Sequence, residues 1–371
     1  MAIKLRTTKF FSLSLFLLML VSSTSVGAHP EIKYDFKFGS FGNTNGLFDH
    51  PVDVEVYGNS LFVSDRGNNR IQKFDLQGNF ITSFGGLGSG ETQLNYPGQI
   101  AVNATHVMVA DYNNVRIQLY DHDGNHLGSF TDPSLQAPYG IATDGKHIYV
   151  SDYYGLDVKM FDMKGNLVKT FGINMPVYPL FVDITDDYVY LAGSYYSSGV
   201  DIFDLTGNWI ANMSAYTYSS TNDYSIDQTG AAYGIHVTNS RIYISDNYLD
   251  KIVIFDRNHK FEYEIGNTDN LDFSFNEPSG MGASDTHLYI ADKLNNRIQA
   301  FSIIPETTTV TTTTTVKTTS TTTETSTKTQ IQTVTADGGS LPSSLPFDFQ
   351  YFILSLFLLV PISRLYRKRK N

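Results

Sequence analysis

Short runs of apolar residues, separated by turn residues, recur through most of the chain. The first group holds four of them, Val52–Val56, Leu61–Val63, Ile71–Phe74 and Phe80–Thr82. β-Branched and aromatic residues dominate the runs, and no window carries a long helical period. The pattern therefore predicts small antiparallel sheets of four short strands each.

The chain contains six copies of this strand group, at a spacing of about forty to fifty residues. The copies begin at Pro51, Pro97, Pro138, Pro179, Tyr233 and Pro278. A marker aspartate recurs at Asp65, Asp111, Asp152, Asp246 and Asp292, and Gly193 takes that place in the fourth copy. One such sheet cannot bury both of its apolar faces, whereas six stacked around an axis can. We expect an all-β fold, a six-bladed β-propeller.

The last copy supplies a clue to how the ring closes. It has only three strands after Pro278, and an additional strand, Ile32–Phe38, stands ahead of the first copy. That strand matches the pattern of a fourth strand. We expect the N-terminal strand to complete the last blade.

The repeat also resembles that of the NHL family. It reads P-x-G-I-x-V, then Y/F-V-x-D, then N-x-R-I-Q-x-F-D, and it is clearest in DRGNNRIQKFD, DYNNVRIQLYD and DKLNNRIQAF. The resemblance spans roughly residues 32 to 303 and implies a propeller. Related propellers serve as lyases, lactonases, RNA binders and receptor ectodomains, so the resemblance does not decide the activity.

The N-terminus has the organisation of a secretion signal. Lys4, Arg6 and Lys9 precede or border the apolar run Phe10–Val21, and small residues lead up to Ala28. We expect residues 1–28 to be a signal peptide cleaved after Ala28. An uncleaved anchor helix is the alternative, although twelve apolar residues are short for a membrane span.

After the repeats, residues 305–344 change composition abruptly. Thr307–Thr335 contains 18 threonines in 29 residues, with no apolar pattern that could support a core. Such a segment is typical of a disordered, extended and O-glycosylated stalk. An unmodified spacer is the alternative, and either would position the propeller domain, residues 29–304.

The C-terminus is apolar and then basic. Residues 345–363 form a 19-residue apolar segment, about 28 Å long as a helix, which predicts one transmembrane helix. The basic residues within 364–371 favour a short cytoplasmic tail. The prediction is a single-pass protein of the cell membrane with an extracellular propeller. A processed sorting signal is the alternative.

Charge and cysteine content exclude some functions. Residues 29–304 hold 16 Lys and Arg against 33 Asp and Glu, a net charge of −17, which disfavours nucleic acid as a partner. The chain has no cysteine, so it has neither disulfides nor thiolate chemistry.

The residues that recur in several copies are expected to be structural. Asp65, Asn69 and Arg70 reappear at one register in other copies, as in Asp111 with Arg116. A catalytic group is needed once, whereas a contact that maintains the fold is needed in every blade. These residues predict turns and ion pairs, and we assign no catalytic residue.

Residues that differ between copies are better candidates for a site. Counted from the proline that opens each copy, or from Ala232 in the fifth, the fifth position reads Glu55, Ala101, Ala142, Asp183, His236 and Gly282. Glu55, Asp183 and His236 could hold a divalent cation such as Ca²⁺ or Zn²⁺ in the central channel. The resemblance to lactonase and amidating-lyase propellers then implies a metal-dependent extracellular hydrolase or lyase. The alternative is a hydrated structural network, with no cofactor.

Tyrosines gather in the loops that should emerge on one face of the propeller. They are Tyr112, Tyr153, Tyr154, Tyr178, Tyr195, Tyr196, Tyr216, Tyr218, Tyr224 and Tyr248. Tyrosine among Asn, Ser and Asp is the composition of adaptable binding surfaces. We expect a cell-surface adhesion or recognition module whose partner is an extracellular glycan, peptide or protein. Tyrosines that only cap the blades are the alternative.

Two sequons suit an exported glycoprotein. They begin at Asn103 and Asn212, and Asn103 is expected in a turn between first and second strands, away from the tyrosine-rich face.

Overall fold

The chain divides into two compact units, each described by itself. One is His29–Ile304, and the other combines Met1–Ala28 with Pro305–Asn371. The computed structural model describes residues 21–22, 31–173, 178–194, 199–213, 232–266, 274–304, 307–316 and 326–335.

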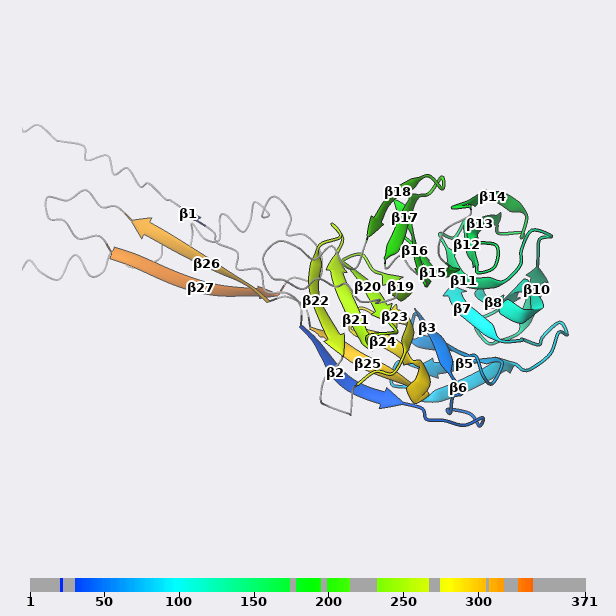
Figure 1. The fold of residues 1–371 in the computed structure, drawn as a ribbon. Coiled ribbons are helices and arrows are strands. Elements are labelled where there is room, and N and C mark those ends of the chain that lie inside the picture. The colour runs from blue at the N-terminus through cyan, green and yellow to red at the C-terminus, as the bar shows by residue number, and fades with distance from the viewer. Residues whose placement is uncertain are drawn as a thin grey trace, which may run out of the picture. The chain divides into compact units, whose positions relative to one another are not determined.

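Six four-stranded antiparallel sheets make up the unit His29–Ile304 (Figure 1). Blade 1 contains β3 (Pro51–Tyr57), β4 (Ser60–Asp65), β5 (Arg70–Asp75) and β6 (Phe80–Gly85). Blade 2 contains β7 (Pro97–Val102), β8 (Val107–Asp111), β9 (Arg116–Tyr120) and β10 (His126–Phe130). Blade 3 contains β11 (Pro138–Thr143), β12 (His147–Asp152), β13 (Asp157–Asp162) and β14 (Leu167–Phe171).

The remaining blades follow the same plan. Blade 4 contains β15 (Tyr178–Ile184), β16 (Tyr188–Ser194), β17 (Val200–Asp204) and β18 (Trp209–Met213). Blade 5 contains β19 (Ala232–Val237), β20 (Arg241–Asp246), β21 (Lys251–Asp256) and β22 (Phe261–Gly266). Blade 6 contains β23 (Pro278–Ala283), β24 (His287–Asp292), β25 (Arg297–Ile304) and β2 (Glu31–Phe38). The predicted all-β, six-bladed propeller is confirmed. Among the described residues, the helical elements are two 3₁₀ turns, η1 (Tyr112–Asn114) and η2 (Lys293–Asn295).

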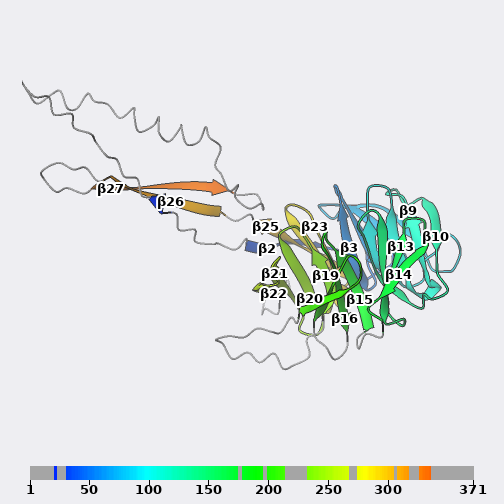
Figure 2. The same cartoon turned by 90° about the horizontal axis from the view of Figure 1, so that it is seen from above.

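The N-terminal strand closes the ring as predicted. Strand β2 pairs antiparallel with β25, with Ile32 opposite Ile303 and Phe38 opposite Ile298. The two strands lie side by side in both views (Figures 1 and 2). The last blade is therefore built from both ends of the repeat region, so the ring is fastened without a disulfide.

The apolar core lies between neighbouring blades, because each sheet buries its faces against the next. Val54 and Phe74 of blade 1, for example, share one buried cluster with Tyr289 and Ile298 of blade 6. The inner strands β3, β7, β11, β15, β19 and β23 touch one another in cyclic order. The alternation of apolar and turn residues is thus explained by stacking around an axis.

The two ends of the propeller differ in what they carry. Pro51, which starts β3, pairs with Asp65, which ends β4, whereas Tyr57 pairs with Ser60 at the other end of the same hairpin. The loops after the marker aspartates and the connections between blades therefore share one end, which we call the marker end. The turns between first and second strands lie at the opposite end.

The second unit holds three strands among its described residues. Strand β26 (Thr307–Val316) pairs antiparallel with β27 (Ser326–Thr335), and β1 (Val21–Ser22) pairs with β26. The predicted transmembrane segment, 345–363, lies outside the described residues, as does most of the signal peptide. Within the described part of the chain, no helix has the length and apolarity needed to cross a membrane. Stalk, anchor and signal stay predictions.

Candidate functional site

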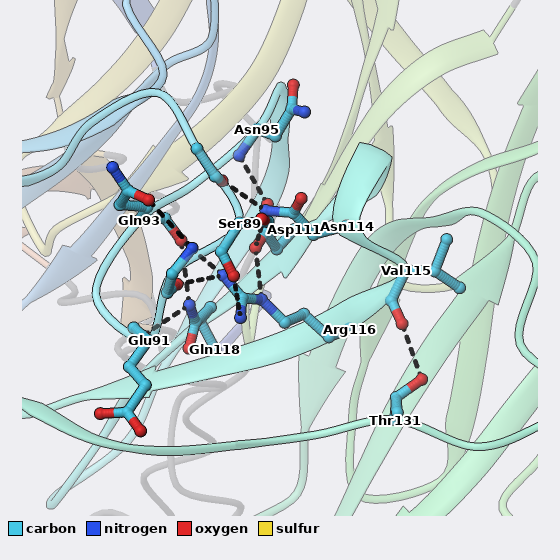
Figure 3. Close-up of polar contacts among 12 residues, drawn as sticks. Ser89, Glu91, Gln93, Asn95, Asp111, Asn114, Val115, Arg116, Gln118 and Thr131 are labelled. Carbon is cyan, nitrogen blue, oxygen red and sulfur yellow. Dashed lines mark hydrogen bonds and ion pairs between the residues drawn. The ribbon is translucent and has the colours of Figure 1, made fainter.

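In blades 1, 2, 3 and 6 the marker aspartate ties the blade to the loop that enters it, as blade 2 shows (Figure 3). The Asp111 carboxylate accepts hydrogen bonds from the backbone N–H of Asn95 at 2.7 Å and from Arg116 Nε at 2.7 Å. A terminal nitrogen of Arg116 donates to the carbonyl oxygen of Gln93 at 2.7 Å. The aspartate and arginine thus satisfy loop backbone groups that would otherwise be unpaired.

The same arrangement recurs in other blades. Arg70 pairs with Asp65 at 2.8 Å, and Arg297 pairs with Asp292 at 2.6 Å. In blade 3 the partner of Asp152 is Lys159, whose Nζ lies 2.8 Å from it. These contacts match the expectation that the recurring residues are structural.

The residue directly after the first marker aspartate is an arginine that reaches across the axis. The guanidinium carbon of Arg66 lies 4.2 Å from the ring centroid of Tyr96, 4.8 Å from that of Tyr139 and 5.3 Å from that of Tyr112. Tyr139 belongs to blade 3, Tyr112 to blade 2 and Arg66 to blade 1. Contact between blades that are not neighbours places this group at the axis, on the marker end.

Arg66 is buried without an anionic partner. Its side chain is only 8% exposed, and its Nε hydrogen-bonds to nothing. Among the described residues no carboxylate forms an ion pair with it. The groups that act on it electrostatically are Tyr139, Tyr233 and Tyr96, and Tyr139 also shares a side-chain hydrogen bond with it. A buried guanidinium usually has a carboxylate or several acceptors, because its desolvation is costly.

Further tyrosines extend this group outward. Tyr153 lies 6.2 Å from Tyr112, and it stacks on Tyr178 at 4.7 Å with 18° between the ring planes. Tyr154 lies 5.0 Å from Tyr153, centroid to centroid. On the inner side, the Tyr139 and Tyr233 hydroxyl groups hydrogen-bond to each other. We call this set the Arg66 cluster; its members are Arg66, Tyr96, Tyr112, Tyr139, Tyr153, Tyr154, Tyr178 and Tyr233.

Phe181 forms the floor of the Arg66 cluster. Its ring centroid lies 5.8 Å from those of both Tyr139 and Tyr233. A Cβ at Gly280 would lie 2.0 Å from Asp53 Oδ1 and 2.7 Å from the Phe181 ring. The glycine therefore makes room for side chains that fill the axis beneath the cluster.

Hydrogen bonding across the axis reinforces this floor. The side-chain oxygen of Gln99 accepts hydrogen bonds from the backbone N–H groups of Ile141 (3.0 Å) and Val182 (3.1 Å), and its amide nitrogen donates to the Val182 carbonyl at 3.0 Å. Blades 2, 3 and 4 are thereby fixed to one another.

Three hydroxyl groups of the cluster stay protonated in neutral solution. Burial raises the pKa of Tyr112, Tyr153 and Tyr233 above the ordinary value, and neighbouring tyrosines add to the effect. These groups can donate and accept hydrogen bonds without carrying charge. The formal charge of the cluster is that of Arg66.

Lys293 of blade 6 borders the cluster but is already paired. Its Nζ lies 5.6 Å from the Tyr233 ring centroid and 2.6 Å from a carboxylate oxygen of Glu277. The pair adds no net charge.

The predicted metal ligands belong to a second group on the inner strands. His236 Nδ1 lies 3.4 Å from Asp183 Oδ2, and Asp183 also accepts a hydrogen bond from the backbone N–H of Val237 at 2.7 Å. Burial, with the charges of Asp53 and Asp183, raises the pKa of Glu55 well above its usual value. In the part of the chain that is described, no three His, Asp or Glu side chains come together as a metal site would require. The divalent cation stays a prediction.

Asp53 is a second buried carboxyl group with a perturbed pKa. It is 1% exposed, and burial raises its pKa from 3.8 to about 8, although the backbone N–H of Ile100 donates to it at 2.8 Å. A carboxyl group held there is protonated at neutral pH.

Of the ten loop tyrosines, the structure brings together four, Tyr112, Tyr153, Tyr154 and Tyr178. Tyr248 is 66% exposed and makes no ring contact with another described residue. The remaining five, Tyr195, Tyr196, Tyr216, Tyr218 and Tyr224, lie outside the described residues.

Sequence reasoning missed Arg66, Tyr96, Tyr139 and Tyr233. The signal was the variable residue directly after each marker aspartate, which reads Arg66, Tyr112, Tyr153, Asn247 and Lys293 where the aspartate is present.

The two candidate glycosylation sites lie on blades 2 and 4. Asn103 is in the turn between β7 and β8, where its side-chain oxygen accepts hydrogen bonds from the backbone N–H groups of Thr105 and His106, both at 2.9 Å. Asn212 is exposed on β18. The turn that holds Asn103 belongs to the end opposite the Arg66 cluster. Glycosylation at either residue stays a prediction.

Solved structures resemble the propeller at low sequence identity. A Bacteroides thetaiotaomicron protein of unknown function shares 15% identity at a TM-score of 0.59, over 74% of this chain and 76% of that chain. Virginiamycin B lyase from Staphylococcus aureus shares 14% identity at a TM-score of 0.52, over 74% of this chain and all of that chain. A streptogramin B lyase shares 12% identity at a TM-score of 0.51, over 73% and 98%.

These similarities define the class of protein by its fold: the chain is a six-bladed β-propeller. No protein-family model and no curated protein matches the sequence. At such low identity the neighbours show the fold alone, so the closer resemblance to NHL repeats stays a prediction.

Proposed function

We propose that this protein is a recognition module of the cell surface, built on an NHL-like propeller, which binds an extracellular ligand at its marker end through the Arg66 cluster. The observation that carries the proposal is the buried, unpaired guanidinium of Arg66 among tyrosine rings. Groups that are costly to bury and left without a partner are typical of functional sites.

Exposure on the outer side of the cluster supports this proposal. Tyr154 is 59% exposed, Tyr96 45% and Tyr178 36%. Rigid aromatic rings with polar tips offer contact area at a small entropic cost, and the burial of their inner neighbours fixes their orientation. A surface that is preorganised in this way loses little freedom on binding.

The terminal segments support display outside the cell. A signal peptide would export the chain, a threonine-rich stalk would extend the propeller from the surface, and residues 345–363 would anchor it. The acidic propeller, at −17, fits a protein or carbohydrate partner better than a nucleic acid.

The proposal is tested by probing glycan and protein arrays with the full-length chain and a double variant, Tyr153→Ala with Tyr178→Ala. We expect the wild type to bind a defined ligand class and the double variant to lose at least tenfold in affinity, because the stacked pair presents the outer contact area. The matched control is Tyr57→Ala, which removes a 37% exposed tyrosine from the opposite end.

The outcomes separate binding from capping. Loss of ligand binding with a melting temperature close to that of the wild type supports a binding surface. A marked loss of thermal stability in the double variant, with no ligand found for the wild type, would show that the tyrosines only cap the blades.

A metal-dependent hydrolase or lyase remains the alternative. It would use Glu55, Asp183 and His236, of which Asp183 and His236 are adjacent. Elemental analysis of the purified chain distinguishes the two functions. A stoichiometric divalent ion that disappears in Asp183→Ala would favour the enzyme.

A further inference from the structure

We infer that Arg66 is the receptor for a single carboxylate carried by an acidic sugar of the uronate type. This inference rests on the proposed binding function and names the chemistry of its ligand. It identifies Arg66 as the residue that determines specificity and the tyrosines as the surface against which the sugar ring packs.

The charge and shape of Arg66 favour a carboxylate. Its guanidinium is planar and permanently charged, and a carboxylate matches it with two parallel hydrogen bonds. The positive charge is surrounded by ring faces at 4.2 to 5.3 Å, and Tyr139 adds one side-chain hydrogen bond. Cation–π contacts of this kind stabilise a cation but leave its N–H donors unsatisfied, as Nε is here.

The surroundings favour a sugar over an extended peptide. Extended peptides commonly bind sheets by pairing with an exposed strand edge. The Arg66 cluster is formed by loops and by inner strands that contact their neighbours in the ring, so it offers no such edge. It offers instead neutral hydroxyl groups and stacked rings, which suit the hydroxyls and the flat apolar face of a sugar.

The electrostatics of the domain favour one carboxylate over many. The propeller carries a net charge of −17, so a long polyanion would be repelled. Within the cluster the net charge is positive, because Arg66 forms no ion pair and Lys293 is neutralised by Glu277. Phe181 closes the floor, so the carboxylate must sit at the end of the ligand or on its edge.

The test compares galacturonic acid with galactose, which differ in a carboxylate and a hydroxymethyl group. Binding of each to the full-length chain is followed by saturation-transfer NMR at neutral pH. We expect galacturonate to bind about 10- to 100-fold more tightly than galactose, the range of a charge-assisted hydrogen-bonded pair. Arg66→Gln should remove this preference, and Arg66→Lys, which keeps the charge but loses the planar fork, should retain only part of it.

A matched control and a competing ligand complete the experiment. Arg257→Gln alters an arginine whose side chain donates to the Thr238 carbonyl at the opposite end, and it should leave the preference intact. Equal binding of the two sugars to the wild type, or an unchanged preference in Arg66→Gln, would overturn the inference. So would a short peptide with a free C-terminus that binds more tightly than galacturonate in an Arg66-dependent way.

Failure of the inference is distinguishable from failure of the proposed function. If the double variant, Tyr153→Ala with Tyr178→Ala, loses binding of an array ligand while Arg66→Gln does not, the proposed recognition surface is supported and the uronate inference is wrong. If the wild type binds no ligand on any array, both are wrong.

Discussion

Arg66 shows how one residue can turn a structural repeat into a candidate site. In blade 2 the equivalent position is Tyr112, and in blade 6 it is Lys293, which Glu277 pairs. Only in blade 1 does the repeat place an arginine there, next to a marker aspartate that is already committed to Arg70. Arg66 therefore contacts tyrosine rings instead of a carboxylate.

Asp53 is the second residue whose chemistry conflicts with its surroundings. It is buried on an inner strand, and its pKa is raised from 3.8 to about 8. The folded protein therefore binds a proton that the unfolded chain releases near pH 4. Between about pH 4 and pH 8 the folded state loses stability as the pH rises, at roughly 1.4 kcal/mol per pH unit.

We predict that Asp53→Asn removes the part of the pH dependence that Asp53 contributes, whereas the part due to the raised pKa of Glu55 remains. The amide oxygen can still accept the hydrogen bond from the Ile100 N–H, and it carries no charge to desolvate. The free energy of unfolding, measured in urea from pH 5 to pH 8, should fall less with pH in Asp53→Asn than in the wild type. The control, Asp285→Asn, alters an exposed carboxylate and should follow the wild type. Parallel slopes in all three proteins would contradict the assignment of a raised pKa to Asp53.

At the scale of the element, the connections that enter blades 1, 2 and 6 are each held by an aspartate and an arginine. In blade 2 the Asp111 carboxylate is fully buried and Arg116 is 15% exposed. The pair binds the loop of residues 86–96 through backbone groups, so that loop is fixed although it is rich in glycine.

We predict that Arg116→Met costs roughly 3–5 kcal/mol of unfolding free energy, because it leaves the buried Asp111 carboxylate without its cation. The measurement is the urea midpoint at neutral pH. Lys251→Met is the matched control, since Glu264, its partner, is 49% exposed and such a pair contributes less than about 1 kcal/mol. Equal losses in both variants would contradict a specific role for the Asp111–Arg116 pair.

The elements were largely predictable from the sequence because turn residues punctuate them at a constant period. The structure extends the strands beyond the apolar runs, as in β3, which spans Pro51–Tyr57 instead of Val52–Val56. The reason is that pairing with β4 continues at both ends of the apolar run: Pro51 lies opposite the marker aspartate Asp65, and Tyr57 lies opposite Ser60. The closing strand was predictable because the final copy has only three strands and an additional strand precedes the first copy.

The site was only partly predictable. Tyr153, Tyr154 and Tyr178 were visible as tyrosines in loops, but the residues at the axis were not. Tyr139 and Tyr233 occupy the second position of inner strands, where the sequence gives no hint that hydroxyl groups from blades 3 and 5 meet. Contacts between blades that are not neighbours depend on the diameter of the ring and on glycines such as Gly280, which no linear pattern reveals.

At the scale of the whole molecule, the two ends of the propeller are chemically different. The marker end presents tyrosine rings around a buried cation, whereas the carboxyl groups of Asp53 and Glu55 lie deeper along the inner strands. Phe181 and Gln99 cross the axis between them. A ligand that enters from the marker end therefore meets Arg66 and the tyrosines first.

The most direct test is hydrogen–deuterium exchange of the full-length chain with and without the ligand that the arrays select. Binding at the Arg66 cluster predicts slower exchange in the backbone segments 66–69, 94–97, 112–115 and 153–156, all at the marker end. Slower exchange confined to the first turns of the blades at the opposite end, or no change anywhere in residues 29–304, would contradict recognition through this face.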